Sequence, residues 1–412
     1  MPENLTATAM PSAAKIRKKY ELARRRVEDF HIRTFEGQPG PIFLISTTYP
    51  GVWLEHAFDA VVWARLNPGD PAAANVARNQ MLLFLRNQKE DGRLPFNVLD
   101  PALMRARGRA GGGVGYSQIQ ECVAFARLCL ETYELTRDRD FLLEAYEKCA
   151  RWDAWLVTNR MTQKTGLIEL FCLYDTGHDN SARLADIPVR CPDADGKIPA
   201  EADAVPMLAP DMNAVFYGDR TALAEMAAVL GRDAEAQAWR EKAEEVRQKM
   251  LELLYDPADE FFYDRDRHGQ LRKFLSISIT NVFTERVPDQ ALFDRIYERH
   301  MKNPAEFWSP YPFPSLALSD PGCVQDRDGN SWGFYAQGLT ALRGMRWMDA
   351  YGRGADYDHL LRQWVSAYAS DDEMLFAQEL HPVTGALSKS SEWYSSAMLL
   401  YMYAVRRLGL LE

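Results

Sequence analysis

The sequence predicts an all-α protein in which helical hairpins close into one ring, an α/α toroid. Eleven segments of the 412-residue chain repeat apolar residues every three to four positions, which is the spacing of an amphipathic helix. Short polar turns join several consecutive segments, so these neighbours are expected to form hairpins. Each hairpin has an apolar face, and two layers of helices would bury all of these faces.

The predicted helices follow one another along the whole chain. They cover residues 13–29, 53–66, 71–88, 117–136, 138–157, 211–230, 232–254, 288–300, 332–352, 356–370 and 392–408. In the clearest hairpin, Gly231 is expected to end one helix and Asp233 to begin the next. A second hairpin turns between Thr136 and Arg139.

Long connections alternate with the short turns. They cover residues 37–52, 89–116, 158–210, 301–331 and 371–391, and they are rich in Trp, Tyr, Gly, Pro, Asp and Asn. Connections of this length in a compact domain are usually functional or disordered, and their aromatic content argues for order. If they gather at one end of the ring, they form a cleft lined by aromatic and acidic groups. Such a cleft suits a sugar, because rings stack on its C–H faces while carboxylates and amides bind its hydroxyls.

Composition excludes several classes of protein. A net charge of −10 lacks the basic field of a nucleic-acid-binding protein. No apolar run reaches the roughly 18 residues of a membrane span. The first residues lack the charged start and apolar core of a signal peptide. We therefore expect neither a nucleic-acid nor a membrane partner.

The six cysteines are scattered, without a CxxC pair or a Cys/His cluster, which indicates buried free thiols in a reducing cytoplasm. The chain has no phosphate-binding loop and no dense set of His, Asp and Glu ligands, so neither a metal nor a cofactor is expected. Homodimers are common among soluble proteins, and a homo-oligomer is left open.

The segment "LYDTGHDNSARL" (173–184) interrupts the helical pattern with two carboxylates four positions apart, Asp175 and Asp179. A general acid at neutral pH needs a raised pKa, which a neighbouring carboxylate or partial burial provides. A solvated loop with helix-capping Asp and Asn is the structural alternative.

Within this segment, "DTGHDNSAR" resembles the "ESGxDNSPR" motif of trehalase-like and mannosyl-oligosaccharide-glucosidase-like glycoside hydrolases of the family 63 type. The resemblance implies that Asp179 is the general acid. Asp175 stands where the family usually has Glu, and it is expected to raise the pKa of Asp179 or to bind sugar hydroxyls. His178 stands where Trp or Met is common, Ala182 replaces Pro, and Arg183 is expected to order the loop or bind substrate.

Other stretches are similar to motifs of the same family, in the same order. "YPGVWLEHAFDA" (49–60) resembles "PGxWxxDxxF", which implies a sugar site with Trp53 as a stacking platform. Glu55 or His56 stands where the family often has Asp. "YSQIQECVAF" resembles "SQPPxxA", with Gln118 at the sugar-contacting Gln, while Gln120 is expected to face solvent.

Towards the end of the chain, "GNSWGFYAQGLTAL" (329–342) stands where the family has "YWRGPVW". Its Arg-Gly-Pro is missing, and Trp332 is expected to bind sugar. "MLFAQELHPVTGALSKSSEWYSSAMLLYMY" resembles the stretch that carries the general base. Glu379 is the expected base, and Glu392 beside Trp393 is the rival. In an inverting enzyme, acid and base lie roughly 6.5–9.5 Å apart.

The matches run in order from residue 49 to residue 403. Together they imply an (α/α)6 toroid of six hairpins and an inverting hydrolase of a small α-linked glucoside or mannoside. The short chain resembles glucosylglycerate and mannosylglycerate hydrolases. Residues 1–36 would form a helical lead-in and residues 37–412 the single catalytic domain.

Two other functions stay open. N-acylglucosamine 2-epimerases are also α/α toroids of similar length and use histidines as acid and base, for which His178 and His381 are the candidates. A non-catalytic glycan-binding homologue is the second alternative, because several family positions are substituted.

Overall fold

Helices arranged in two layers form a closed ring in the computed structural model, which describes residues 10–46, 48–109, 112–372 and 376–411. Within these residues, six inner helices contact one another in sequence and the last returns to the first, with α9 and α11 meeting through the turn that extends α11. They are α2 (Ala57–Leu66), α5 (Phe125–Thr136), α7 (Pro210–Val229), α9 (Ile279–Thr284), α11 (Gly338–Arg343) and α13 (Ser395–Arg407). This closure confirms the predicted toroid.

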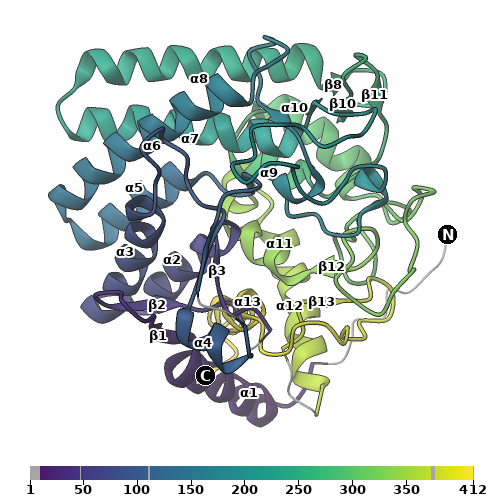
Figure 1. The fold of residues 1–412 in the computed structure, drawn as a ribbon. Helices are drawn as coiled ribbons and strands as arrows, with labels where there is room; N and C mark the ends of the chain where they lie inside the picture. The colour runs from purple at the N-terminus through teal and green to yellow at the C-terminus, as the bar shows by residue number, and fades with distance from the viewer. Residues whose placement is uncertain (1–9, 47, 110–111, 373–375, 412) are drawn as a thin grey trace.

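The outer helices alternate with the inner ones along the described chain. They are α1 (Ala13–Arg26), α3 (Pro71–Arg86), α6 (Arg139–Asn159), α8 (Asp233–Leu253), α10 (Gln290–Ile296) and α12 (Gly354–Ser370). Helices α7 and α8 lie side by side at the top of Figure 1, whereas α1 and α13 meet near the bottom. The chain therefore closes the ring by bringing its two ends together.

Local chemistry sets several helix ends. The Asp70 carboxylate accepts from the Ala72 N–H at 2.8 Å, and Pro71 occupies the first position of α3. At the predicted α7–α8 hairpin, Gly231 adopts φ +78°, where a side chain would be strained. Helix α8 begins at Asp233, as predicted.

Several predicted helix boundaries are wrong, and two of these errors fall on segments that line the cavity described below. Residues 117–124 are not helical, because their main chain pairs with the segment before Asp179: the Ile119 N–H donates to the Asp175 carboxylate and the Glu121 N–H to the Asp175 carbonyl. Residues 332–337 are likewise extended or turn-like. The sequence analysis also missed α4 (Pro101–Ala106) and α9, both of only six residues.

Short strands, which were not predicted, organise the long connections. Antiparallel pairs join β1 (Ile32–Thr34) to β2 (Pro41–Phe43), β8 (Tyr255–Asp256) to β9 (Phe261–Phe262), and β12 (Ala336–Gln337) to β13 (Glu379–Leu380). A three-stranded sheet holds β3 (Gly51–Trp53), β4 (Asn97–Leu99) and β5 (Val114–Gly115). A four-stranded sheet holds β6 (Glu169–Leu170), β7 (Met207–Leu208), β10 (Asp264–Arg265) and β11 (Leu271–Arg272).

The predicted lead-in packs against the end of the chain. The Tyr401 hydroxyl donates to the Ile16 carbonyl at 3.1 Å, and Arg406 donates to the Tyr20 hydroxyl at 2.7 Å. The boundary at residue 36 falls in the turn between β1 and β2. Residues 1–9 of the lead-in lie outside the described residues, and the division there stays a prediction.

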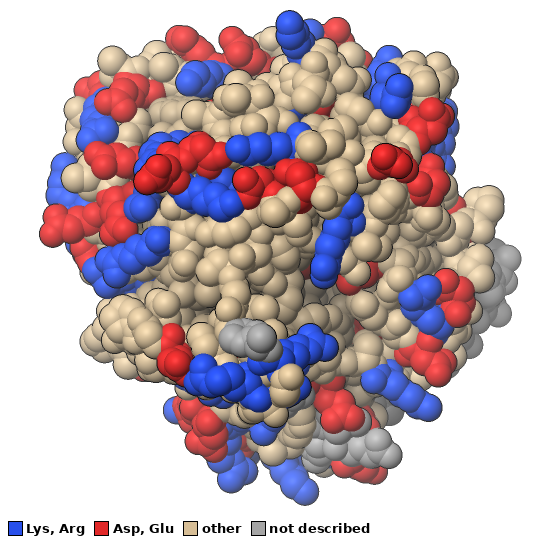
Figure 2. Space-filling view, in the orientation of Figure 1, with Lys and Arg blue, Asp and Glu red and all other residues tan. Residues whose placement is uncertain are grey.

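Acidic and basic side chains are interleaved over the face shown in Figure 2, without one large basic field on that face. No helix among the described residues is long and apolar enough to cross a membrane.

Candidate active site

A cavity of about 230 Å³ collects residues from all five of the long connections. It is lined by Ile45, Tyr49, Trp53, Glu55, His56, Phe96, Asn97, Gln118, Gln120, Tyr174, Gly177, Asp179, Arg190, Asn330, Trp332, Leu339, Gln378 and Tyr394. The connections predicted to form a cleft therefore meet at one place. Of the predicted site residues, Trp53, Glu55, His56, Gln118, Asp179 and Trp332 line this cavity.

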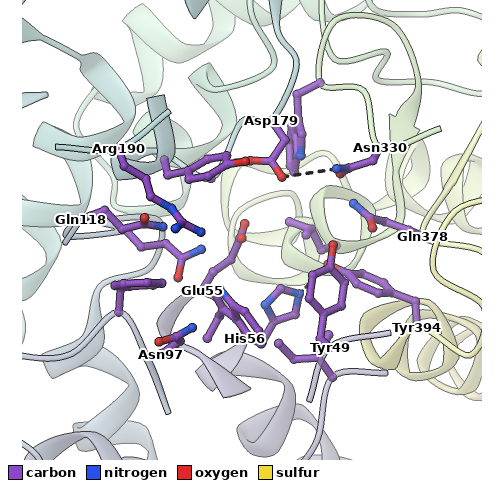
Figure 3. Close-up of a pocket in the computed structure, with 18 residues that line it drawn as sticks. Tyr49, Glu55, His56, Asn97, Gln118, Asp179, Arg190, Asn330, Gln378 and Tyr394 are labelled. Carbon is purple, nitrogen blue, oxygen red and sulfur yellow. Dashed lines mark hydrogen bonds between the residues drawn. The ribbon is translucent and has the colours of Figure 1, made fainter. Parts of the chain in front are cut away.

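Asp179 points its carboxyl group into the cavity from the loop that follows β6 (Figure 3). Burial, together with the charge of Glu379, raises the pKa of Asp179 to about 6, although a hydrogen bond from Asn330 opposes the shift. A carboxyl group with this pKa is partly protonated near neutral pH, so it can both carry and release a proton.

Glu379 lies on β13, fully buried behind Asn330, and it does not itself line the cavity. Its Oε1 accepts from the Asn330 N–H and from the Ser390 hydroxyl at 3.0 Å, and its Oε2 accepts from the Ser331 N–H at 3.3 Å and from Gln337 Nε2 at 2.5 Å. Burial raises the pKa of Glu379, and these four donors oppose the shift. Because each donor binds the ionised form, the site can hold Glu379 as a carboxylate.

Glu55 is a second carboxyl group on the cavity wall, and Figure 3 shows it pointing inwards. Burial raises the pKa of Glu55 to about 7, while nearby Arg343 lowers it. Arg343 lies 3.6 Å from its carboxylate and donates to its main-chain carbonyl at 2.9 Å. The main chain at Gly177 lies against the Glu55 carboxyl group. A side chain at position 177 would not fit, since its Cβ would lie 2.9 Å from Glu55 Oε2.

Four buried polar atoms on the cavity wall have no partner among the described residues. They are Gln118 Oε1, Gln120 Oε1, Gln378 Oε1 and His56 Nδ1. Burial lowers the pKa of His56 to about 3, so its ring is neutral. A buried polar atom without a partner is costly, and a polyhydroxy ligand would satisfy all four. The expectation that Gln120 faces solvent is wrong, because its side chain is buried.

Trp332 lines the cavity with His178 behind it. The two rings stack with centroids 4.4 Å apart and an angle of 17°. His178 does not line the cavity, and its Nδ1 accepts from Arg183 at 3.1 Å. Burial lowers the pKa of His178 to about 3. The predicted direct contact of His178 with substrate is therefore not supported, and its position is that of a support for Trp332.

Asp175 and Arg183 also lie beneath the cavity rather than on its wall, which corrects their predicted contact with sugar. Asp175 is fully buried, and its Oδ2 lies 2.5 Å from Arg160 Nη1. Arg160 and main-chain N–H groups hold the pKa of Asp175 below its usual range, against the effect of burial. Arg183 is buried between Asp211 and Asp264. Both residues therefore order the loop that carries Asp179.

Glu392 and Trp393 lie outside the cavity, so their predicted roles in sugar binding are not supported. Glu392 is exposed and borders a different cavity with Lys389. The Trp393 ring packs 6.0 Å from the Phe376 ring and 5.1 Å from the Arg26 guanidinium carbon. Asn330 links Glu379 to Asp179, and no such link is found for Glu392 among the described residues, so Glu379 stays the preferred candidate for the base.

Sequence reasoning missed several residues of the cavity wall, notably Tyr49, Tyr174, Arg190, Gln378 and Tyr394. Arg190 has the most distinctive chemistry, because it is exposed at the cavity and no ion pair is found for it among the described residues. Its position between Pro188 and Pro192 gave no signal. The Tyr394 hydroxyl and His56 Nε2 form a hydrogen bond of 2.5 Å. The sequence could not show this contact, because the two residues are 338 positions apart.

One group of described residues has the spacing of a metal site. Ligand atoms of Cys172, Asp175 and Cys191 lie within 4.8 Å of one another. Arg160 already pairs with Asp175, and its Nη2 lies 3.8 Å from Cys191 Sγ. A cation therefore occupies this position already, and the group does not fit a metal ion.

Replacing Arg160 with methionine should lower the free energy of unfolding by about 3–5 kcal/mol, because it leaves the buried Asp175 carboxylate without its cation. Urea unfolding measures the change. The double variant Arg160→Met with Asp175→Asn should recover part of the loss. The exposed pair of Arg24 and Glu28 provides the control, since Arg24→Met should change stability little. A loss in Arg160→Met no larger than in this control would contradict the expectation.

Comparison with known proteins supports the family predicted from the motifs. The model of the mannosylglycerate hydrolase MGH1-like glycoside hydrolase domain matches residues 49–396. No match was found among curated proteins.

Solved structures share the fold. The GH63 mannosylglycerate hydrolase from Thermus thermophilus in complex with Tris has a TM-score of 0.70 and 18% identity, over 94% of this chain and 99% of that one. Neutral trehalase Nth1 from Saccharomyces cerevisiae has a TM-score of 0.66 and 12% identity, over 95% and 82%. At these identities the structures establish the toroid alone. The family match spans most of the chain, which therefore belongs to the mannosylglycerate hydrolase MGH1-like family of glycoside hydrolases.

Proposed function

We propose that this glycosidase hydrolyses a small α-glucoside or α-mannoside with inversion, with Asp179 as general acid and Glu379 as general base. The observation that carries the proposal is that Asp179 opens into the cavity while a single residue, Asn330, donates to both carboxylates. In an inverting enzyme the two carboxyl groups lie roughly 6.5–9.5 Å apart, which leaves room for a water molecule.

In this mechanism Asp179 protonates the glycosidic oxygen as the bond to the anomeric carbon breaks. Glu379 takes a proton from a water molecule that attacks the opposite face of the sugar. One water is consumed, and the protein returns to its starting state when Glu379 loses the proton and Asp179 regains one from solvent. The two roles require opposite protonation states. The four donors around Glu379 favour its carboxylate, whereas burial and the charge of Glu379 favour the protonated form of Asp179.

The proposed sugar site is the inner part of the cavity. The unpartnered oxygens of Gln118, Gln120 and Gln378 would accept hydrogen bonds from sugar hydroxyls. Glu55 would accept further ones when ionised. Trp53 and Trp332 offer aromatic faces to the apolar C–H side of the ring.

The proposed leaving group is a short acid such as glycerate. Arg190 contributes a guanidinium to the wall, and its carbon lies 5.9 Å from the Tyr174 ring centroid. Guanidinium groups bind carboxylates in a fork. The Thermus structure with the same fold is named as a mannosylglycerate hydrolase, which agrees with an acidic leaving group.

The free cysteines fit a cytoplasmic enzyme.

Proton NMR of product formation tests the proposal. A panel of α- and β-linked disaccharides and glycosyl-glycerates would be offered to the wild type and to Asp179→Asn. The anomer of inverted configuration should appear first and be lost in the variant. Retained configuration in the first product would refute the inverting mechanism.

Replacing Arg190 with alanine should raise KM for an acidic glycoside about 10–100-fold with little change in kcat, because a charge-assisted hydrogen bond contributes roughly 1.5–3 kcal/mol. Steady-state kinetics would be measured on two substrates, a glycosyl-glycerate and the matching glycoside of neutral glycerol. The comparison distinguishes binding of the leaving group's charge from binding of its shape. Only the acidic member should be affected. Equal losses on both would contradict the assignment.

The alternative of a sugar epimerase finds no support in the positions of its histidines. His178 lies behind Trp332, and His381 Nδ1 accepts from the Val383 N–H at 3.1 Å. Neither lines the cavity. In D₂O the same NMR spectra would reveal an epimerase through loss of a ring-proton signal, and binding without turnover would indicate a non-catalytic homologue.

A further inference from the structure

Residues 329–332 form a bridge between Asp179 and Glu379, the two carboxylates of the proposed function. The Asn330 amide donates to Asp179 Oδ2 at 3.4 Å, and the Asn330 main-chain N–H donates to Glu379 Oε1. The Trp332 N–H donates to the Asp179 carbonyl at 2.9 Å. The bridge thus contacts both the side chain and the main chain of Asp179.

The main chain of the bridge is shaped for these contacts. Asn330 has φ +51°, in the left-handed region that asparagine and glycine tolerate better than other residues. Its carbonyl accepts from Asn180 Nδ2 at 2.6 Å. Gly329 lets the main chain approach closely, because a Cβ there would lie 3.0 Å from Glu379 Oε1 and 2.8 Å from the Ser390 Cβ.

We propose that Asn330 is a positioning residue that holds the proton donor and the base as one unit, with its amide on Asp179 and its main-chain N–H on Glu379. This inference rests on the proposed function. In the stretch that carries the bridge, the Arg-Gly-Pro of the similar family motif is missing.

The amide acts on the charge that develops during the reaction. Asp179 becomes a carboxylate as it gives up its proton, and a donor already directed at Oδ2 binds the carboxylate more strongly than the neutral acid. The contact therefore strengthens in the transition state, which lowers the barrier. In the free enzyme the same contact lowers the pKa of Asp179, against the effects of burial and of Glu379.

The variant Asn330→Gly tests the amide alone, because glycine keeps the main-chain N–H and tolerates the left-handed conformation. The pH dependence of kcat/KM and kcat would be measured. We expect the alkaline limb to move upwards by about 0.5–1 pH unit and kcat to fall about 10-fold, since one donor to a carboxylate is lost. Asn330→Asp has nearly the same shape but replaces the donor with an acceptor. The alkaline limb of its pH profile should therefore move upwards by more than in Asn330→Gly.

Asn180→Gly is the matched control. It removes the hydrogen bond to the Asn330 carbonyl but no contact to the Asp179 carboxylate, and glycine fits its φ of +59°. Its alkaline limb should stay at the wild-type pH, because the Asn330 amide still donates to Asp179. A limb that moves equally in Asn180→Gly and Asn330→Gly, or in neither, would overturn the proposal.

A second readout does not depend on activity. Carbon-13 NMR of aspartate-labelled protein gives the pKa of Asp179 directly, with its signal assigned by its loss in Asp179→Asn. A higher pKa in Asn330→Gly than in the wild type supports the proposal, and an unchanged value overturns it. If the wild type hydrolyses no glycoside, the proposed function fails while this titration still decides whether Asn330 controls Asp179.

Discussion

Replacing Asp179 with asparagine should lower kcat about 10²–10⁴-fold on a glycoside with an alcohol leaving group, because asparagine cannot supply the proton that this group needs. In an aryl glycoside with a strongly acidic phenol, the phenolate is a good leaving group and departs without being protonated. The loss on that substrate should be much smaller. Comparing kcat on the two substrates therefore identifies the role of Asp179 as well as its importance.

The pH profile offers an independent check of the same residue. A general acid works only when protonated, and the pKa of Asp179 is raised to about 6 by burial and by Glu379. The wild-type kcat/KM should therefore decline above about pH 6, and this limb should disappear in Asp179→Asn. At lower pH, activity should also fall as Glu379 becomes protonated, because only its carboxylate can accept a proton from water. An alkaline limb that survives in the variant would show that another group donates the proton.

The free energy of unfolding of Asp179→Asn shows whether the variant is inactive because it lacks the general acid or because it is unfolded. The carboxyl group of Asp has a pKa near 3.9 in an unfolded chain and about 6 here, so the folded state holds the proton more tightly. Its contribution to folding therefore becomes less favourable as pH rises from about 4 to 6 and stays lower above that range. Asp179→Asn should then raise the free energy of unfolding at pH 7.5 by about 1–3 kcal/mol. An inactive variant that is more stable than the wild type cannot owe its inactivity to unfolding.

The ring could be predicted from the sequence because it depends on periodic burial of apolar residues. Outer helices such as α6 and α8 carry one apolar stripe each, and the 3.6-residue period reveals them directly. Inner helix α9 has only six residues, too few for a period to show, whereas α11 is the short helical part of the longer helix predicted at 332–352. The segment 117–124 has helix-like spacing, yet its main chain pairs with the loop around Asp175.

The site was predicted less completely, because residues adjacent in an irregular loop can point in opposite directions. Asp175 and Asp179 belong to one motif, but only Asp179 reaches the cavity, while Asp175 pairs with Arg160 below it. Spacing along the chain does not distinguish these directions where no helix or strand sets them. Asn330 comes from another connection, 301–331, and only the folded ring places it beside Asp179.

Replacing Glu379 with alanine should lower kcat about 10²–10⁴-fold on every substrate, including the aryl glycoside, because the attacking water loses its base whatever the leaving group. This behaviour differs from that of Asp179→Asn. In the structure four donors surround the Glu379 carboxylate. The attacking water would have to replace one of these donors, and the Ser390 hydroxyl is the one that can rotate away from Oε1.

Azide distinguishes the base from other carboxylates of the site. This anion attacks the anomeric carbon without a base, so it should restore turnover in Glu379→Ala. It should form a glycosyl azide of inverted configuration while the leaving group takes its proton from Asp179. Glu55→Ala is the matched control, since Glu55 lies on the cavity wall and its pKa is raised to about 7 by burial. We expect a higher KM and no rescue by azide in Glu55→Ala. Rescue of Glu55→Ala in place of Glu379→Ala would assign the base to Glu55, and the water would then attack from the wall that Glu55 occupies.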